Sequence, residues 1–160
     1  MVSHSMIRVL VVCAGNTCRS PMAEAVLRQA ALRFDARSVA VASAGVRCRN
    51  PGGPADPRAI TAAGAQGIDI SAHCQRQFAT KDFADYDLIL AMDATIMADI
   101  MTQAPDLAKP RIRLFLGDRD VPDPYAGNAD DYSRTLRIII EGARRLFSEP
   151  GLLSDQGSSS

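Results

Sequence analysis

The chain has 160 residues, in which 18 Lys and Arg balance 18 Asp and Glu, and 47% of the residues are hydrophobic. A chain of this length buries about 70% of the surface that its unfolded form exposes, so one domain is stable without a metal ion or a disulfide. The balanced charge argues against a nucleic-acid partner, and no apolar run approaches the about 18 residues that span a membrane. We expect one domain over residues 1–150, with residues 151–160 as a flexible tail.

The N-terminal sequence and the cysteines bear on compartment and cofactors. The apolar run from Ile7 to Cys13 is too short for a secretory signal, and Asn16 and Arg19 follow it at once. We therefore expect a cytoplasmic protein whose four cysteines are free, catalytic or redox-active rather than structural disulfides. The cysteines lack the CxxC and His spacing of a zinc site, so neither a metal ion nor another cofactor is predicted.

Strands and helices alternate along the sequence. Runs rich in β-branched and apolar residues predict buried strands over residues 7–12, 39–43, 87–92 and 111–115. Helices are predicted from Pro21 with Ser20 as the N-cap, from Pro57 to about Ala65 with Asp56 as the N-cap, from Asp93 to Gln103, and from Asp130 to Phe147. This order indicates the α/β class: a single domain with a four-stranded, parallel, twisted sheet and helices on both faces.

The loop after the first strand is the first candidate site, because ligands of such folds bind beyond the carboxyl ends of the strands. Its residues are Cys13, Ala14, Gly15, Asn16, Thr17, Cys18 and Arg19. Gly15 and Asn16 tolerate left-handed backbone angles, so successive N–H groups can turn toward one anion, and the next helix points its positive end at the same place. Arg19 can hold two phosphate oxygens, and this positive potential favours the nucleophilic thiolate form of Cys13.

The run VCAGNTCRSPMAE, residues 12–24, resembles the signature of the low-molecular-weight protein tyrosine phosphatase family. Further motifs match in the family's order: Ser43-Ala44-Gly45, Gly67-Ile68-Asp69 with His73, the segment 87–93, and Asp123-Pro124-Tyr125. The resemblance implies the phosphotyrosine phosphatase I-like fold and a metal-independent phosphatase. Residues 13–19 would then be its phosphate-binding loop, with Cys13 as the nucleophile and Arg19 as the phosphate ligand.

The resemblance also implies a general acid. Attack by a thiolate on a phosphomonoester leaves an alkoxide or phenoxide that needs a proton, and the family places the acid that supplies it in the Asp-Pro-Tyr motif, here at Asp123. Pro122 and Pro124 restrict the backbone around this carboxyl group. From the residues alone, Asp118 and Asp120 remain alternatives.

Residues around the expected cleft are less well defined. Tyr125 is expected to line the cleft wall and stack on an aromatic substrate, whereas Ala126 stands where family members often carry a second aromatic residue. The loop of residues 46–57, which includes Arg47 and Arg49, is expected to form part of the rim. Tyr132 is interpreted as an anchor of the last helix.

Side chains outside the catalytic trio match family positions that brace the loop by hydrogen bonds: Asn16, Ser20, Ser43 and His73. The family also uses a cysteine five residues after the nucleophile as a resolving thiol, which makes Cys18 the expected redox partner of Cys13. Such a disulfide protects an oxidised nucleophile from further oxidation. Cys48 and Cys74 are given no role.

Three substrates are compatible with this site. Phosphotyrosine in proteins is the first, because a deep cleft admits a long phosphoaryl group. Phosphoarginine is the alternative, because Thr17 stands where tyrosine-directed members commonly have a bulkier aliphatic residue and its hydroxyl could bind a guanidinium nitrogen. Arsenate reduction is the third, but residues 75–95 lack the cysteines that its thiol relay needs. We expect phosphorylated proteins, and phosphate or other oxyanions, as the ligands.

Overall fold

The computed structural model describes residues 6–34 and 38–153. Its strands are β1 (Ile7–Cys13), β2 (Val39–Gly45), β3 (Leu88–Ala91) and β4 (Ile112–Leu114). They form one parallel sheet of four strands in the order β2-β1-β3-β4. The carboxyl end of β1 lies between its two neighbours, since Cys13 pairs with Gly45 of β2 and Val12 pairs with Ala91 of β3. The predicted fold class is therefore confirmed.

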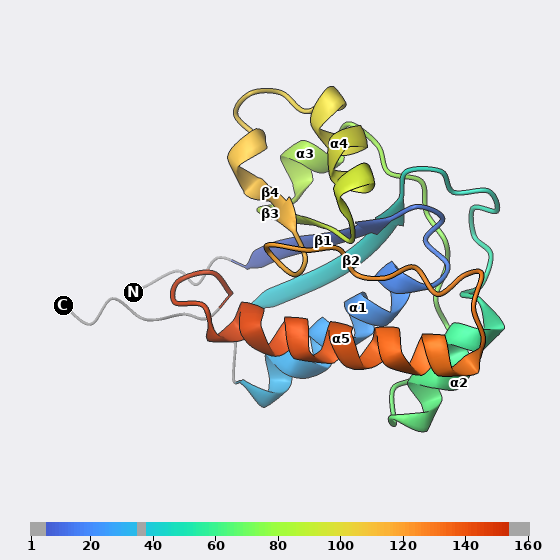
Figure 1. The fold of residues 1–160 in the computed structure, drawn as a ribbon. Coiled ribbons are helices and arrows are strands. Elements are labelled where there is room, and N and C mark those ends of the chain that lie inside the picture. Colours follow the sequence, from blue (N-terminus) through green and yellow to red (C-terminus); the bar gives the residue numbers. More distant parts are fainter. Residues whose placement is uncertain (1–5, 35–37, 154–160) are drawn as a thin grey trace.

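Helices cover both faces of this sheet (Figure 1). They are α1 (Arg19–Arg33), α2 (Pro57–Ala65), α3 (Asp82–Asp85), α4 (Ala94–Gln103) and α5 (Ala129–Ser148), with a short 3-10 turn, η1 (Lys109–Arg111), before β4. Helices α1, α2 and α5 lie on one side of the sheet, and α3 and α4 lie on the other (Figure 1). In the order β2-β1-β3-β4, β2 is added on one side of β1 and β3 on the other. The strand order therefore reverses beside β1, and open α/β sheets bind their ligands at such a point.

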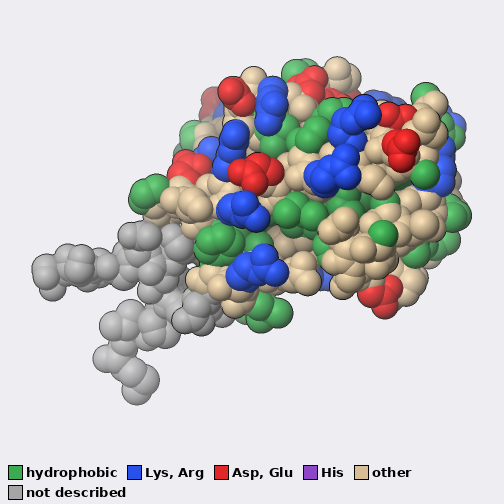
Figure 2. Space-filling model, turned by 60° about the horizontal axis from the view of Figure 1, so that its bottom comes forward, with side chains coloured by type: hydrophobic (Ala, Val, Ile, Leu, Met, Phe, Trp, Pro, Cys, Tyr) green, Lys and Arg blue, Asp and Glu red, His purple; other side chains and the backbone are tan. Residues whose placement is uncertain are grey.

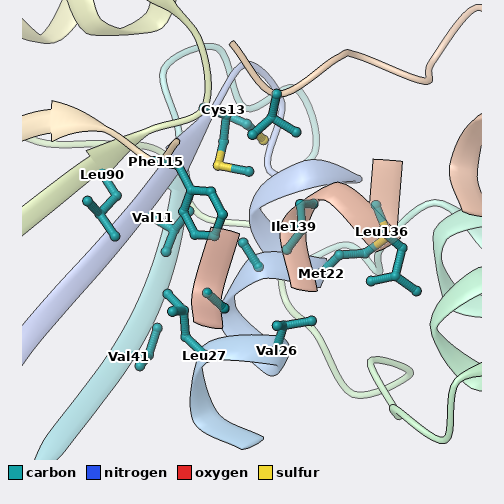
Figure 3. Close-up of a cluster of buried hydrophobic side chains, with 14 of the residues drawn as sticks. Val11, Cys13, Met22, Val26, Leu27, Val41, Leu90, Phe115, Leu136 and Ile139 are labelled. Atoms are coloured by element: carbon teal, nitrogen blue, oxygen red, sulfur yellow. The ribbon is translucent and has the colours of Figure 1, made fainter. Parts of the chain in front are cut away.

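Each central strand is buried on both faces. In β1, Val9 and Val11 belong to the hydrophobic cluster shared with α1, α2 and α5, whereas Leu10 and Val12 belong to the cluster shared with α3 and α4. Figure 3 shows Val11 in the first cluster among side chains of the sheet, α1 and α5. Since successive side chains of a strand point to opposite faces, a continuous apolar run needs a layer of helices on each side.

The helix starts agree with the sequence prediction to within about two residues, whereas one of the two predicted N-caps is wrong. The Asp56 carboxylate caps α2 by accepting from Arg58 N, and the Asp93 carboxylate caps α4 by accepting from Ile96 N. The prediction of Ser20 as the N-cap of α1 is wrong, because the helix begins at Arg19 and the residue before it, Cys18, makes no side-chain cap. The Ser20 hydroxyl is instead directed to Cys13 Sγ, at 2.9 Å.

Two short elements were not expected from the sequence. The predicted strand at 111–115 is reduced to Ile112–Leu114, because η1 takes up Arg111. The Arg111 guanidinium donates to the carbonyl oxygens of Phe83 in α3 and of Tyr86 just after it. Hydrogen bonds between residues so far apart in the sequence leave no periodic pattern in it. The sequence therefore does not predict α3 or η1.

The packed part of the chain continues beyond residue 150. Residues 151–153 form a turn, and Leu153 is 1% exposed within the cluster beneath α1 and α5. Residues 151–153 of the predicted tail thus pack against the domain, and residues 154–160 of that prediction lie outside the described residues. No helix in the described part of the chain is long and apolar enough to cross a membrane.

The face turned forward in Figure 2 carries basic, acidic and hydrophobic side chains side by side. The balanced formal charge of the sequence is thus reflected in a mixed surface on this side of the molecule. Because this mixed surface has no strong potential of one sign, the positive potential that attracts an anionic ligand must come from a few groups at the carboxyl ends of the strands.

Two helical glycines give opposite expectations for stability. A Cβ at Gly142 of α5 would lie 2.7 Å from both Phe115 Cε1 and Leu116 Cδ2, and the Phe115 ring is buried. We expect Gly142→Ala to lower the free energy of unfolding by about 1–2 kcal/mol, because the overlap outweighs a gain in helix propensity of about 1 kcal/mol. Gly64→Ala in α2, where nothing lies within 4 Å, should raise it by up to about 1 kcal/mol. Urea unfolding measures both, and a stabilised Gly142→Ala protein would contradict the packing.

Candidate active site

A pocket of about 350 Å³ opens at the carboxyl end of β1. Its lining residues come from the end of β1 and the loop after it, from the segment after β2, from the segment between α2 and α3, and from the loop before α5: Cys13, Ala14, Gly15, Thr17, Cys18, Arg19, Arg47, Arg49, Gln75, Asp123 and Tyr125. The structure thus brings the three predicted catalytic residues into one pocket. It also places Tyr125 and the expected rim arginines there.

Cys13 ends β1 and lies inside the curve of the loop. Its sulfur accepts a hydrogen bond from the Asn16 backbone N–H, with 3.3 Å between N and Sγ. The Ser20 hydroxyl oxygen lies 2.9 Å from the same sulfur. Hydrogen bonds of this kind stabilise a sulfur anion, as does the N-terminus of α1, which begins at Arg19. The residue is 3% exposed, so the reacting atom is reached through the pocket.

The loop keeps its curvature because Asn16 adopts a left-handed conformation with φ of 59°. Its side chain is fully buried, and every polar atom of it is satisfied: Nδ2 donates to Ser20 Oγ at 2.8 Å and to Ser43 Oγ at 3.0 Å, and Oδ1 accepts from Arg76 N at 2.8 Å. Asn tolerates this backbone conformation better than most residues, and the three hydrogen bonds hold it there.

The bracing residues predicted from the sequence come together around Asn16. His73 Nε2 lies 2.9 Å from the Asn16 carbonyl oxygen, and since a carbonyl only accepts, Nε2 carries the proton. The Ser43 hydroxyl accepts a hydrogen bond from Asn16 Nδ2 and donates one to Glu24 Oε1 at 2.6 Å. Glu24 in α1 was not predicted; its position four residues after Ser20, on the same helix face, is the signal that could have shown it.

Arg19 is 3% exposed, so its positive charge needs a partner inside the protein. Its Nη1 donates to Asp93 Oδ2 at 2.9 Å and to the Val121 carbonyl at 2.8 Å. Its Nη2 lies 3.7 Å from Asp123 Oδ2. One side of the guanidinium is therefore held by the protein, while the other side faces the carboxyl group in the pocket. Asp93, which follows β3, is the partner that the sequence reasoning did not identify.

The three candidate acids lie in different surroundings. Asp120 accepts from Ala94 N at 2.9 Å and so supports the start of α4. Asp118 is not part of the pocket lining, whereas Asp123 is, with a side chain that is 52% exposed. Asp123 Oδ1 accepts from Tyr125 N at 3.1 Å, which leaves its Oδ2 facing Arg19. The side chain of Tyr125 is exposed at the pocket wall, as predicted.

A second polar cluster lies behind the loop and includes Cys18. The Tyr132 hydroxyl lies 3.4 Å from Asp56 Oδ2 and 3.3 Å from Cys18 Sγ. A carboxylate only accepts, so the single hydroxyl proton goes to Asp56 and the Cys18 thiol donates to the Tyr132 oxygen. Burial, and the nearby negative charge of Asp56, raise the pKa of Cys18, which agrees with a protonated thiol. Tyr132 thus anchors α5, as expected, and also contacts the loop.

The charge of Asp56 is fixed by Arg58, the second residue of α2. The Arg58 guanidinium binds both Asp56 oxygens, with Nε 3.1 Å from Oδ1 and Nη2 2.9 Å from Oδ2. These hydrogen bonds hold the pKa of Asp56 below its usual value. Burial of the hydroxyl raises the pKa of Tyr132.

Gln75 was missed by the sequence reasoning. It is 8% exposed, lines the pocket, and holds the loop 46–57 by donating from Nε2 to the Pro54 carbonyl at 2.8 Å. Cys48 and Cys74 lie outside the pocket lining, and no group of three potential metal ligands occurs within the described ranges.

A sulfur nucleophile held inside an anion-binding loop suits attack on phosphorus, and this chemistry defines the cysteine-dependent phosphatases. The family model for low molecular weight phosphotyrosine protein phosphatase matches residues 8–155. The chain therefore belongs to that family. Its similarity to the low molecular weight protein-tyrosine-phosphatase Wzb of Salmonella typhi is 36% identity over 141 residues, which cover 86% of this chain and 90% of Wzb.

Solved structures show the same relationship. Wzb of Vibrio vulnificus in complex with benzylphosphonate superposes with a TM-score of 0.81 at 33% identity, covering 90% of this chain and 99% of that one. A mutant of YwlE from Bacillus subtilis has a TM-score of 0.82 at 32% identity, covering 89% of this chain and 97% of YwlE.

Gly45 offers a test of the loop geometry. A Cβ there would lie 2.7 Å from the Ala14 carbonyl oxygen and 2.8 Å from Asn16 N, both backbone atoms of the loop. Gly45→Ala must therefore displace the loop around Cys13, and we expect phosphate or vanadate to bind about tenfold more weakly, a loss of about 1.4 kcal/mol. Calorimetric titration measures this. Gly64→Ala serves as the control, and unchanged affinity in Gly45→Ala would contradict the close approach of β2 to the loop.

Proposed function

We propose that this protein hydrolyses phosphotyrosine in proteins through a phosphocysteine intermediate. The observation that carries the proposal is the position of the Cys13 sulfur within hydrogen-bonding distance of Asn16 N and Ser20 Oγ, in the pocket that Arg19 and Asp123 also line. The chain's relatives are named protein-tyrosine phosphatases, which supports the same activity.

The proposed reaction has two steps. The Cys13 thiolate attacks phosphorus and forms the S–P bond, while the bond from phosphorus to the tyrosine oxygen breaks and Asp123 gives that oxygen its proton. Asp123 then takes a proton from water, whose oxygen attacks phosphorus and releases inorganic phosphate and the Cys13 thiolate. Arg19 and the loop N–H groups bind the phosphoryl oxygens, whose charge is spread most widely in each transition state.

Phosphorylated proteins are the proposed substrates, and phosphate and related oxyanions are the proposed ligands of the loop. Tyr125 supplies an exposed aromatic ring at the pocket wall, suited to stacking on a phosphoaryl group. Arg47 and Arg49 add positive charge at the rim, which attracts a doubly charged phosphate. Among the structural neighbours, Wzb of Vibrio vulnificus was solved with benzylphosphonate, an aryl-bearing phosphonate.

Phosphoarginine is the second candidate substrate, and one residue favours it. Thr17 lines the pocket, and its hydroxyl oxygen lies 3.6 Å from Cys18 Sγ. YwlE is described as an arginine phosphatase in a structure with a phosphorylated active-site serine, which superposes on this chain with a TM-score of 0.81 at 32% identity. A hydroxyl at this position offers a guanidinium an acceptor that an aliphatic side chain lacks.

Cys18 is proposed as the thiol that resolves an oxidised Cys13. Both cysteines line the pocket, and burial keeps Cys18 protonated, so it does not compete with Cys13 for the phosphate. If peroxide oxidises Cys13 to the sulfenic acid, the Cys18 sulfur forms the disulfide and water leaves. A nucleophile that must stay reduced also fits the proposed cytoplasmic location.

Removal of the proposed nucleophile and removal of the proposed acid should affect kcat/KM in different ways. We expect Cys13→Ser to lower kcat/KM for phosphotyrosine peptides by at least about 10⁴-fold, because a serine hydroxyl is a far weaker nucleophile than the thiolate it replaces. Asp123→Asn should cost about 10²-fold or more with poor leaving groups and much less with acidic phenols, which leave without a proton. Steady-state kinetics with a series of aryl phosphates measure this, and retained activity in Cys13→Ser would overturn the mechanism.

Thr17→Ile separates the two candidate substrates. If phosphotyrosine is the substrate, the wild-type protein has the higher kcat/KM with phosphotyrosine peptides, and Thr17→Ile changes it by less than about threefold. The ratio of kcat/KM for phosphotyrosine to that for phosphoarginine peptides should rise about fivefold in the variant, since one lost hydrogen bond is worth about 1 kcal/mol. A wild-type preference for phosphoarginine would make the second candidate the correct one.

A further inference from the structure

Arg58 contacts three parts of the site at once. Besides both oxygens of Asp56, its Nη1 donates to the Tyr125 carbonyl at 3.0 Å and to the Gly127 carbonyl at 3.4 Å. Its guanidinium carbon also lies 4.7 Å from the centre of the Tyr132 ring and 5.5 Å from that of Tyr125. The planar guanidinium thus uses both its edge and its face, which a lysine could not do.

These contacts connect the phosphate-binding loop to the segment that carries the acid. On one side, Asp56 N donates to the Thr17 carbonyl of the loop at 2.8 Å. On the other side, Arg58 holds the backbone directly after Asp123. The two halves of the reaction, nucleophile and acid, are therefore joined through two residues at the start of α2.

The acid segment is weakly held by other groups. The Thr135 hydroxyl reaches the Pro122 carbonyl at 3.4 Å, and the Gly127 N–H bonds within the segment to the Pro124 carbonyl. Asp123 and Tyr125 are both more than half exposed, so burial does little to fix them. The carbonyl oxygens of Tyr125 and Gly127 accept from Arg58, whose own orientation is set by Asp56.

We propose that Arg58 is a positioning residue for the proposed reaction: it holds the segment 123–127 so that the Asp123 carboxyl group faces the leaving-group oxygen of a phosphate bound above Cys13. This inference rests on the proposed function. Loss of Arg58 would let the acid segment move relative to the loop, and a displacement of about 1 Å is enough to weaken proton transfer severely. Binding of the phosphate itself, which depends on Arg19 and the loop, would change little.

The test compares Arg58→Gln with the wild type on aryl phosphates whose phenols differ in pKa. We expect kcat/KM to fall about tenfold with the most basic phenol and less than about twofold with the most acidic one, because the latter leaves without help from an acid. Arg144→Gln is the matched control, since Arg144 is an exposed arginine of α5 that pairs with Glu141. A uniform loss across the series, or no loss, would overturn the proposal.

A double-mutant cycle separates the loss of acid positioning from a general loss of structure at the site. In an Asp123→Asn background, Arg58→Gln should lower kcat/KM by less than about twofold, because the carboxyl group that it positions is gone. If the two losses multiply, Arg58 acts by another route. If Asp123→Asn itself has no dependence on the leaving group, the assignment of the acid fails and the proposal fails with it. Should Arg58→Gln not fold, Arg58→Lys must show a smaller loss with the same dependence.

Discussion

The hydrogen bonds of the buried Asn16 side chain are the interaction on which the rest of the site depends. A loop that turns its N–H groups toward one sulfur needs a residue with positive φ, and here that residue is Asn16 at 59°. An unsatisfied amide at a fully buried position costs about 1–3 kcal/mol, so the partners of Asn16 are as necessary as the residue itself. Ser20, Ser43 and the backbone of Arg76 supply them, each from a different part of the chain.

The positive charge of the site likewise depends on a few oriented groups. Arg19 is buried, and Asp93, the N-cap of α4, neutralises it from the side away from Asp123. The remaining face of the guanidinium points to Asp123 in the pocket. In a chain with no net charge, the anion-binding site is therefore produced by the orientation of a few groups and by the start of α1.

The sequence was sufficient to predict the fold class and to find the residues that come together in the candidate site, because both leave local signals. Apolar runs show buried strands, and Cys13 and Arg19 lie on one short loop with Gly15 and Asn16 between them. Prediction failed where a role depends on contacts distant in the sequence. Asp93, Gln75 and Arg58 reach the site from three separate segments, and no spacing rule relates them to Cys13.

Ser20 illustrates a different kind of error. A serine before a proline at a helix start is normally read as a cap, but the same hydroxyl can serve a neighbouring acceptor if one is present. Here the sulfur of Cys13 and the amide of Asn16 both lie within reach, and the helix begins without a side-chain cap. At Ser20, contacts with the candidate site thus replace the helix cap that the local sequence predicts.

The most direct test of this account is to look for the covalent intermediate. Wild-type protein should be mixed with an aryl phosphate, quenched in acid within milliseconds, digested and examined by mass spectrometry. The account predicts a phosphoryl group on the peptide that contains Cys13, at up to one per molecule, and none in Cys13→Ala. Rapid turnover with no phosphate bound to the protein, or with phosphate on a different residue, would contradict it.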